Sequence, residues 1–305
     1  MTAVERAPAA EGQLDEPARA GDGFAAYAVT TRSGPHVTMQ AGVVHGGRFI
    51  TTTSRSSLKA RSVRAHRTAA AAIEHDDGTT EVVSGATVSV DLRHPEGMLT
   101  DPAGALIAGP AALRLAGDQL EQLLGYVEAA GRVPSGWLPH NRVLLVTRID
   151  RSLLLQGFDV LDGSGDWAPE LPGPAEPLEH APTQAQPLPE LPEDVAGLVQ
   201  SDAPARIGLT AEHGPVVLPA RWRCDDRFDV SASALAQLGA RLPGAGCATF
   251  DDSSSRRPDR KRGVMLRGAL ALVDVDGPRA TLAVQADRIT AWDGFSAQTT
   301  DVGER

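Results

Sequence analysis

Residues 51–61 read TTTSRSSLKAR, and this stretch decides the fold that the sequence predicts. The threonines are typical of a β-strand end, the serines around Arg55 form a short polar loop, and a helix is predicted over Ser57–Ala65. Ser56 and Ser57 both suit the N-cap position. Backbone N–H groups at a helix start, serine hydroxyls and flanking cations together form a pocket for an anion.

The cations of this stretch fit a phosphate. Arg55 offers a planar fork of donors and Lys59 a mobile ammonium. A phosphomonoester carries about −1.5 to −2 charges at neutral pH, so two cations neutralise it. Residues 24–73 contain no Asp or Glu, although the whole chain is acidic. The alternative is a helix with a solvated arginine face, a description that suits Arg64 and Arg67.

Short apolar runs broken by Gly, Pro and Asp surround this stretch, and they predict an all-β barrel or sandwich. Gly34-Pro35 and Gly46-Gly47 are turn dipeptides between such runs. The runs are Ala25–Thr30, Val37–Val44, Phe49–Thr53, Ala69–Ile73, Val82–Val90 and Val143–Ile149.

The second half of the chain repeats the first in the same order, which predicts two copies of one domain. The matches pair Gly34-Pro35 with Gly214-Pro215, Arg48-Phe49 with Arg227-Phe228, Arg64–Glu74 with Arg241–Asp251, and Val83–Ala86 with Leu266–Ala269. Asp150-Arg151 and Gly157-Phe158 likewise match Asp287-Arg288 and Gly294-Phe295.

The repeat predicts the domain boundaries. Residues 1–22 form a disordered tail, 23–160 the first domain, 161–194 a proline-rich linker and 195–305 the second domain. The first copy carries an insertion at about 95–135 that includes a predicted helix over Gly117–Gly131. We expect this insertion to plug one barrel end, with a lid as the alternative.

The sequence resembles a known family at the motifs quoted above. Gly34-Pro35-His36-Val37-Thr38, then Gly47-Arg48-Phe49, then the spacing Thr53-x-Arg55-x-Ser57-x-Lys59-x-Arg61, resemble the FMN-binding split β-barrel family. That family includes pyridoxamine-phosphate oxidases and relatives that use a deazaflavin coenzyme. The resemblance covers about residues 24–92 well and the second half more loosely. It implies a mainly β protein with short helices, built as two tandem Greek-key split β-barrels related by internal duplication.

The resemblance also implies a cofactor site. Arg55, Ser57 and Lys59 would hold the phosphate of FMN, with Arg61 in the same motif, and Thr52 and Thr53 would line the ribityl chain. The strand of His36, Val37, Thr38 and Met39 would run beside the flavin ring. His36 is either a flavin or substrate contact or a solvent-facing residue of an edge strand.

The second copy departs from this pattern. Aligning Thr249-Phe250 with Ala72-Ile73 puts Ala234–Ala236 opposite Ser57–Lys59, and Arg55 falls in a short deletion. Hydroxyl and ammonium are then absent and acids such as Asp225 and Asp229 lie nearby, which would repel a phosphate. We therefore expect one flavin site per chain, built on the first copy.

Members of the family resemble symmetric dimers with flavins between subunits. A duplicated chain can build that pair internally as a pseudo-dimer, and a homodimer of whole chains is the alternative. Arg221, Trp222, Arg288 and Trp292 are candidates for the far wall of the site, since guanidinium and aromatic planes both contact flavin rings. The competing interpretation places the tryptophans in the core.

These features predict an FMN-dependent oxidoreductase acting on an unidentified small molecule, with a reduced nicotinamide or a flavin reductase as partner. No Ser-His-Asp arrangement, paired carboxylates or HExxH helix favours hydrolysis. The alternative is a non-catalytic flavin, deazaflavin or haem carrier or sensor. Haem would need a histidine near the site, and the histidines available are His36, His66 and His140.

The composition of the chain limits the kinds of partner that the sequence predicts. The formal net charge of −10 gives no overall footprint for nucleic acid. The basic run Arg256–Arg262 could recognise an anionic substrate or RNA, or form a solvated loop. Cys224 and Cys247 have no metal-ligand spacing, so we expect no metal. Without a signal peptide or an apolar span, the sequence predicts a cytoplasmic protein.

Overall fold

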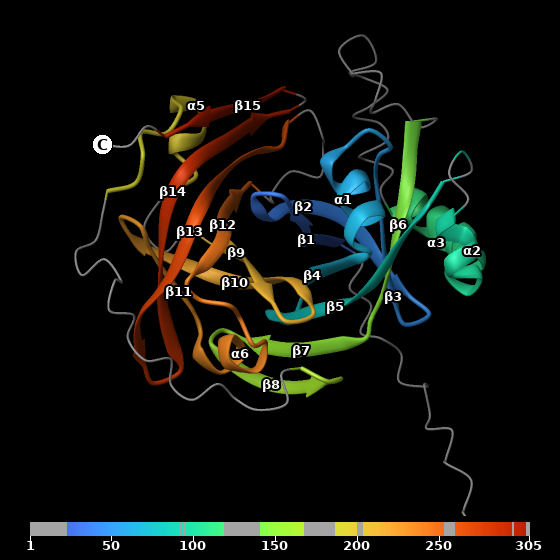
Figure 1. Cartoon of the computed structure of the whole chain (residues 1–305), viewed down its shortest axis with the longest axis horizontal. Coiled ribbons are helices and arrows are strands. Elements are labelled where there is room, and N and C mark those ends of the chain that lie inside the picture. The colour runs from blue at the N-terminus through green and yellow to red at the C-terminus, as the bar shows by residue number, and fades with distance from the viewer. Residues whose placement is uncertain are drawn as a thin grey trace, which may run out of the picture.

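A computed structural model of the chain describes residues 23–91, 93, 96–118, 141–167, 187–199, 204–252, 260–294 and 296–302. Within these residues the protein is mainly β, with a few short helices, and it forms two closed six-stranded antiparallel barrels. Figure 1 shows the first barrel in blue to green beside the second in yellow to red. The predicted fold class and the internal duplication are therefore confirmed.

The first barrel closes in the strand order β4-β1-β2-β3-β6-β5, with β5 pairing back to β4. Alternation along β3 shows which face is inside: Phe49 lies in the core with Tyr27, while Ile50 lies on the opposite face. The elements are β1 (Gly23–Thr31), β2 (Gly34–His45), β3 (Arg48–Ser54), α1 (Leu58–His66), β4 (Thr68–Glu74), β5 (Thr79–Val90), β6 (Arg142–Arg148), β7 (Arg151–Gln156) and β8 (Asp159–Ser164).

The second barrel closes in the equivalent order β12-β9-β10-β11-β14-β13, with β11 pairing to β14. Its long strand β14 takes the place of both β6 and β7, and β15 takes the place of β8. The elements are α5 (Glu193–Ala196), β9 (Pro204–Ala211), β10 (Gly214–Cys224), β11 (Arg227–Ser231), α6 (Ala232–Gln237), β12 (Gly244–Asp251), β13 (Arg262–Asp276), β14 (Arg279–Asp293) and β15 (Ser296–Asp301).

Two glycines mark the same irregularity in both barrels. A Cβ on Gly85 would lie 1.9 Å from the carbonyl oxygen of Arg148, and one on Gly268 would lie 1.9 Å from that of Gln285. Both positions require glycine because a backbone segment of the neighbouring strand crosses there. The pairings Ser84↔Arg151 and Arg267↔Arg288 next to them agree with the match read from the sequence.

The described part of the insertion, residues 96–118, lies outside the first barrel and not in its end. Its helices α2 (Glu96–Thr100) and α3 (Pro102–Asp118) lie on the outer side of the first barrel (Figure 1). Ala108 and Ala111 of α3 pack on Val43 and Ile50, which face away from the barrel core. The end of the barrel is covered instead by α1, whose Ala60 and Val63 belong to that core. The helix predicted over Gly117–Gly131 lies almost entirely outside the described residues.

The two barrels pack on each other through related surfaces. Strand β2 contacts β12, and its counterpart β10 contacts β4, the counterpart of β12. The tightest contacts between the barrels are related in the same way. A Cβ on Gly34 of the first barrel would meet Ala245 of the second, and a Cβ on Gly214 of the second would meet Thr68 of the first. The contacts thus follow an approximate two-fold relation within one chain, and one apolar cluster includes residues of both barrels. A homodimer of whole chains stays a prediction.

No helix in the described part of the chain is both long and apolar enough to cross a membrane.

Candidate functional site

The predicted phosphate pocket lies where β3 passes into α1, and we call this region (Thr51–Arg61) the first corner. Ser57 caps α1: its Oγ accepts the N–H of Ala60 at 3.1 Å, and its φ and ψ of −63° and 157° are those of a cap. Thr53 donates its hydroxyl to Ser57 Oγ at 3.0 Å. The sequence therefore located this helix start correctly, and both hydroxyls point into one local network.

Lys59 is the cation of the first corner that contacts strand β2. Its Nζ donates to Thr38 Oγ1 of β2 at 2.7 Å, and no carboxylate of a described residue forms an ion pair with it. Burial, with help from the charges of Arg142 and Lys261, lowers the pKa of Lys59 to about 7. A partly buried ammonium without an anionic partner is the feature expected of an anion-binding site.

Arg55 and Arg61 are placed differently from Lys59. Arg55 Nε forms a 2.8 Å ion pair with Asp91, whose carboxylate is fully buried, while Arg55 Nη1 is buried without a hydrogen-bond partner in the part of the chain described. Arg61 lies exposed on α1. The structure thus holds Arg55 through a carboxylate and leaves Arg61 in solvent.

Thr52 of β3 is hydrogen-bonded to β6, and Thr51 to β2. Arg142 donates Nε to Thr52 Oγ1 at 2.6 Å and Nη2 to the Thr52 carbonyl at 2.9 Å. The hydroxyl of Thr51 donates to the carbonyl of Ala41 at 2.6 Å. Sequence reasoning missed Arg142. The signal that could have found it is its counterpart Arg279 in the second copy, because Ser54↔Arg142 and Ser231↔Arg279 are equivalent strand pairs.

Strand β2 divides its side chains between two environments. Val37 and Met39 are buried in the apolar cluster between the barrels, and Thr249 of β12 donates its hydroxyl to the Val37 carbonyl at 3.3 Å. Thr38 faces Lys59. His36 accepts a hydrogen bond at Nδ1 from Arg267 at 2.8 Å, and burial with the charges of Lys59 and Arg267 lowers its pKa to about 3. The imidazole is therefore neutral at physiological pH.

The second barrel brings three side chains to this region. Lys261 lies with Nζ 3.5 Å from the centre of the Phe24 ring of β1. Asp251, at the end of β12, is buried, and burial raises its pKa to about 6 against the opposing charge of Lys261. Trp292 packs over Gly263, which leaves no room there for a Cβ, and its interaction with Asp251 lowers the pKa of that carboxyl. Of the four wall candidates from the sequence, Trp292 is the one that the structure brings to this cluster.

The other wall candidates lie elsewhere. Arg288 pairs with Asp301 at 2.8 Å and is exposed. Trp222 donates to the carbonyl of Asp225 and packs edge-on against Phe250. Arg221 lies 5.8 Å from the centre of the Phe158 ring, at the second barrel's own copy of the corner.

That second corner (Asp229–Ser233) keeps a helix cap but not a cation on the helix. Ser231 Oγ accepts the N–H of Ala234, as Ser57 does with Ala60. The sequence alignment that placed Ala234 opposite Ser57 was therefore wrong by three residues, and the hydroxyl is not lost. Ser231 both ends the strand and caps the helix because the Arg55 loop is absent. Ser233 then occupies the position of Lys59.

The strand pairing also corrects a second residue match between the two copies that the sequence predicted. Asp229 pairs with Thr281 and takes the place of Thr52, so Arg227 corresponds to Ile50 and not to Arg48. The β10–β11 hairpin is shorter because of an irregularity between Trp222 and Cys224. An acid therefore stands at the threonine position.

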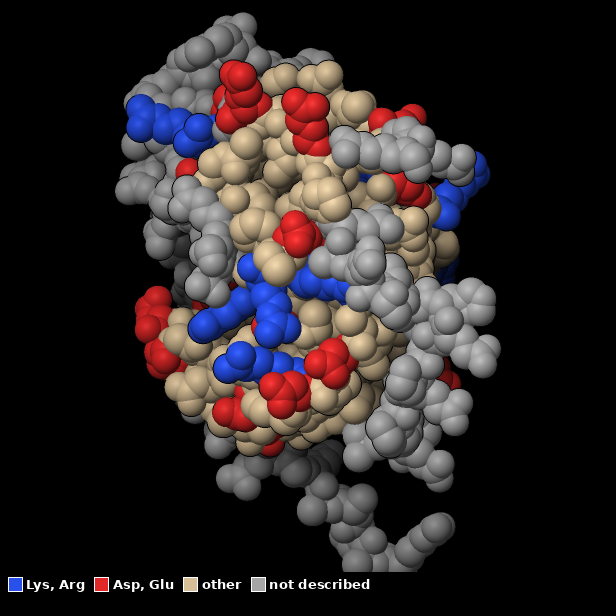
Figure 2. All heavy atoms as spheres, turned by 90° about the vertical axis from the view of Figure 1, so that its left-hand side faces the viewer, with Lys and Arg blue, Asp and Glu red and all other residues tan. Residues whose placement is uncertain are grey.

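The second corner is filled by the first barrel. The β7–β8 hairpin brings Phe158 to it, and Ser231 donates its hydroxyl to the Phe158 carbonyl at 2.7 Å. Arg221 and Arg279 both lie against the Phe158 ring, at 5.8 and 5.4 Å from its centre. Cations are thus present here, against the sequence-based expectation, but they contact an aromatic ring of the same chain. Figure 2 shows the side of the molecule that lies at the left of Figure 1, where basic side chains gather among acidic ones.

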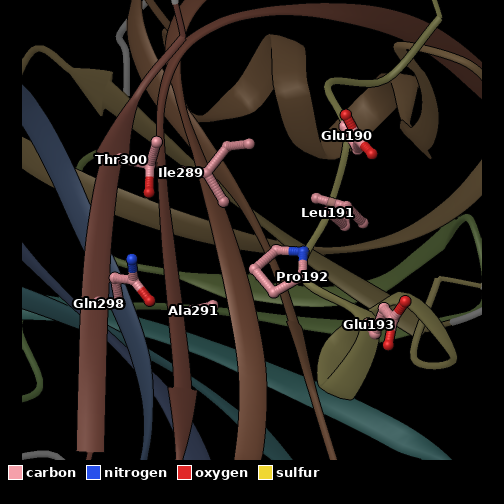
Figure 3. Close-up of a pocket in the computed structure, with 8 residues that line it drawn as sticks. All are labelled: Glu190, Leu191, Pro192, Glu193, Ile289, Ala291, Gln298 and Thr300. Atoms are coloured by element: carbon pink, nitrogen blue, oxygen red, sulfur yellow. The ribbon is translucent and has the colours of Figure 1, made fainter.

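Other candidate features lie apart from the first corner. A pocket of about 350 Å³ is lined by Glu190–Glu193 and by β14 and β15, and none of the predicted site residues lines it (Figure 3). His66 is exposed at the end of α1, and His140 and most of Arg256–Arg262 lie outside the described residues. Among the residues described, no group of three His, Cys, Asp or Glu could hold a metal ion.

Fold and site together define a class of protein: a tandem split β-barrel whose first barrel carries a basic corner where β3 passes into α1. No family model and no curated protein matches the sequence. Solved structures do match, among them pyridoxamine 5'-phosphate oxidase-like FMN-binding proteins and related split barrels.

Three of these matches show the different kinds of solved structure to which the chain is similar. An FMN-binding protein related to pyridoxamine 5'-phosphate oxidase from Nostoc punctiforme is 13% identical, covers 44% of this chain and 74% of its own, and has a TM-score of 0.32. An F420 reductase is 18% identical over 47% and 90% of the two chains, with a TM-score of 0.27. A heme-binding protein from Mycobacterium smegmatis is 14% identical over 48% and 53%, with a TM-score of 0.29.

Proposed function

We propose that the chain binds the phosphate of a flavin-type cofactor, FMN in the first instance, at the first corner. The observation that carries this proposal is Lys59, a partly buried ammonium beside a capped helix start that has no carboxylate partner among the described residues. The pKa of Lys59 is lowered because burial disfavours its charge, and a phosphate beside the ammonium would favour the charge again.

The residues of the first corner fit a phosphate group. Lys59 supplies a mobile cation, the free N–H groups of the first turn of α1 supply backbone donors, and Arg142 adds a second positive charge beside Thr52. The buried, unpartnered Nη1 of Arg55 is a further donor in the same loop. Thr38, which now accepts from Lys59, would orient that ammonium.

We further propose an oxidoreductase acting on a small molecule. A flavin, when bound, supplies hydride and electron transfer, and the protein supplies binding, orientation and exclusion of water. The contact between the barrels excludes water on one side of the corner, since Val37 and Met39 are buried there. A reduced nicotinamide, a flavin reductase or a deazaflavin coenzyme would provide the electrons, and the substrate is a small molecule.

One observation favours a second candidate, a flavin carrier or sensor without turnover. His36 is neutral and already accepts a hydrogen bond from Arg267, so it has no proton to give from Nδ1. The haem alternative would need His36 or another histidine as ligand, and the Nδ1 of His36 is engaged.

The test is reconstitution of the purified full chain with FMN, followed by desalting and an absorption spectrum. We expect about one flavin per chain, and we expect the variant Lys59→Ala to retain far less. Ser233→Ala, at the equivalent position of the second corner, is the matched control and should bind as the unmodified protein does. Failure to retain flavin, or equal retention by Lys59→Ala, would overturn the proposal. Turnover with a reduced nicotinamide or reduced deazaflavin separates the enzyme from the carrier.

A further inference from the structure

Arg267 of β13 is a buried cation that reaches from the second barrel to the first. The residue is 8% exposed. Its Nη2 donates to His36 Nδ1 at 2.8 Å, and its Nη1 donates to Ser33 Oγ at 3.2 Å. Ser33 lies in the turn between β1 and β2, and His36 lies near the start of β2. The guanidinium therefore crosses the contact between the barrels and ends on two neutral groups.

This guanidinium has no anionic partner in the part of the chain that the structure describes. Its Nε is buried without a hydrogen-bond partner there, and no described carboxylate forms an ion pair with it. Asp287 and Arg288 on the neighbouring strand β14 act on its charge in opposite directions, and Arg288 pairs with Asp301. Because an unpaired buried charge lowers stability, packing alone does not explain an arginine at this position.

The duplication provides an internal control for this position. The equivalent strand pairings place Ser84 of β5 where Arg267 stands in β13, and Val216 of β10 where His36 stands in β2. Both of these counterparts are buried. The same backbone arrangement is therefore built in the other half of the molecule without the charge and without the imidazole.

The polar character of β2 extends beyond His36. Every second residue from His36 is half-buried, and the residues between them are buried, so the half-buried ones share one face of the strand. The three polar residues on this face are His36, Thr38 and Gln40, and their buried counterparts on β10 are Val216, Leu218 and Ala220. The barrel fold is thus satisfied by apolar side chains here, and the polar face is particular to the first copy.

This face joins Arg267 to the first corner. Lys59 Nζ donates to Thr38 Oγ1 at 2.7 Å, and Arg267 donates to His36 two residues earlier on the same face. Alternate residues of a strand lie about 7 Å apart. The two cations therefore contact neighbouring positions of one strand face, so a site at Arg267 is separate from the phosphate position and adjacent to it.

The groups around Arg267 define the kind of ligand. Ser33 is exposed, so the guanidinium ends at a hydroxyl that faces solvent and that an anion can replace. His36 accepts at Nδ1, which places its proton on Nε2 and leaves the imidazole a neutral donor. The planar fork of a guanidinium matches a carboxylate with two parallel N–H bonds. One positive charge beside neutral donors balances a single negative charge, which favours a carboxylate over a phosphate dianion.

We infer that Arg267 and His36 form a cross-barrel subsite for a carboxylate group of the substrate, next to the cofactor position on β2. The inference rests on the proposed function in one respect, that the ligand of the subsite is the substrate of the flavin. It assigns a binding residue to the second barrel and names the substrate class as a small carboxylic acid.

The direct test titrates the purified full chain with acetate at constant ionic strength and follows labelled histidine side chains by NMR. The chain has eight histidines, and the variant His36→Gln identifies the signal of His36. Acetate should shift this signal, whereas acetamide, a neutral molecule of the same shape, should not. Arg267→Met should weaken acetate binding at least tenfold. Arg288→Met, which removes an arginine from the paired strand, is the matched control and should stay within twofold.

Two results of this titration would overturn the inference. One is a His36 signal that acetate does not shift in the unmodified chain, and the other is equal acetate affinity in Arg267→Met. Arg267→Lys, which keeps the charge without the planar fork, should bind acetate with intermediate affinity. Acetate should also raise the melting temperature of the unmodified chain and not that of Arg267→Met. A lower melting temperature in Arg267→Met with unchanged acetate binding would make Arg267 a structural residue only.

Flavin binding separates failure of this inference from failure of the proposed function. If the chain retains no FMN but binds acetate through Arg267, the proposed function is wrong and the subsite stands. If FMN is retained and acetate does not bind, the subsite is wrong and the proposed function stands. If Arg267→Met weakens FMN and riboflavin equally while acetate has no effect, the guanidinium contacts the flavin ring and the carboxylate subsite is wrong.

Discussion

The two corners of the molecule are built on the same backbone plan, but they present different chemistry. In the first, Ser57 caps α1 and Lys59 donates to Thr38, and no carboxylate of the described residues forms an ion pair with Lys59. In the second, Ser231 caps α6, and the same hydroxyl donates to Phe158 of the opposite barrel. The comparison teaches that a helix cap alone does not define the site. What differs is the cation and what occupies the space in front of it.

The clearest difference between the corners is the Arg55 loop, which only the first corner has. Arg55→Ala would remove the 2.8 Å charge-assisted contact between Arg55 Nε and the buried Asp91 carboxylate, so we expect a loss of about 1.5–3 kcal/mol in the free energy of unfolding. Denaturant unfolding of the full chain measures this, with exposed Arg64→Ala as the control that should change stability by less than about 0.5 kcal/mol. A loss as small as that of the control would show that the ion pair does not hold the loop.

The difference in cations predicts a difference in binding. Lys59→Ala removes a charge-assisted contact worth about 1.5–3 kcal/mol, so the Kd for FMN should rise roughly 10- to 150-fold. Fluorescence titration measures it, and Ser233→Ala in the second corner should leave Kd unchanged. If the two variants behaved alike, the two corners would not differ in the way proposed.

The filled state of the second corner can also be tested. Phe158→Ala removes a ring that contacts Arg221 and Arg279, each contact being worth about 0.5–1 kcal/mol, so we expect a loss of about 1–2 kcal/mol in stability. Phe158→Leu, which keeps apolar volume without a π face, should lose less. FMN affinity at the first corner should be unaffected in both variants. An unchanged melting temperature in Phe158→Ala would mean that the ring does not fill the corner.

The last prediction concerns how much the buried charge of Lys59 lowers the free energy of unfolding. The pKa of Lys59 is about 7 in the folded chain and 10.5 in its ordinary state, so the unfolded state holds more protons between these values. Stability therefore rises with pH across this window, relative to a variant without the group. Without ligand, the stability of Lys59→Met relative to the unmodified chain should be greatest near pH 7, and this advantage should decline toward pH 10. A constant difference from pH 7 to pH 10 would remove the buried charge as its cause.

Much of the fold could be predicted because its signals are local. Alternating apolar runs gave the strands from β1 to β6, and TTTSRSSLKAR gave the strand end, the loop and the Ser57 cap. The duplication was also visible, since Gly34-Pro35 and Gly214-Pro215 mark equivalent turns. The alignment failed at the second corner because a deletion of the loop and a shorter hairpin shift the register, and residue types alone do not record a strand pairing.

The sequence by itself determined the two barrels, the capped helix start and the identity of its cations, because these depend on side-chain periodicity and on residues within a few positions of each other. Only the tertiary structure decided that Arg55 pairs with Asp91, that Arg61 lies in solvent, and that Lys261 meets Phe24 across the interface. It also decided that Phe158 occupies the second corner. These contacts join residues far apart in the chain, and their energies depend on burial, which arises only when the two barrels pack together.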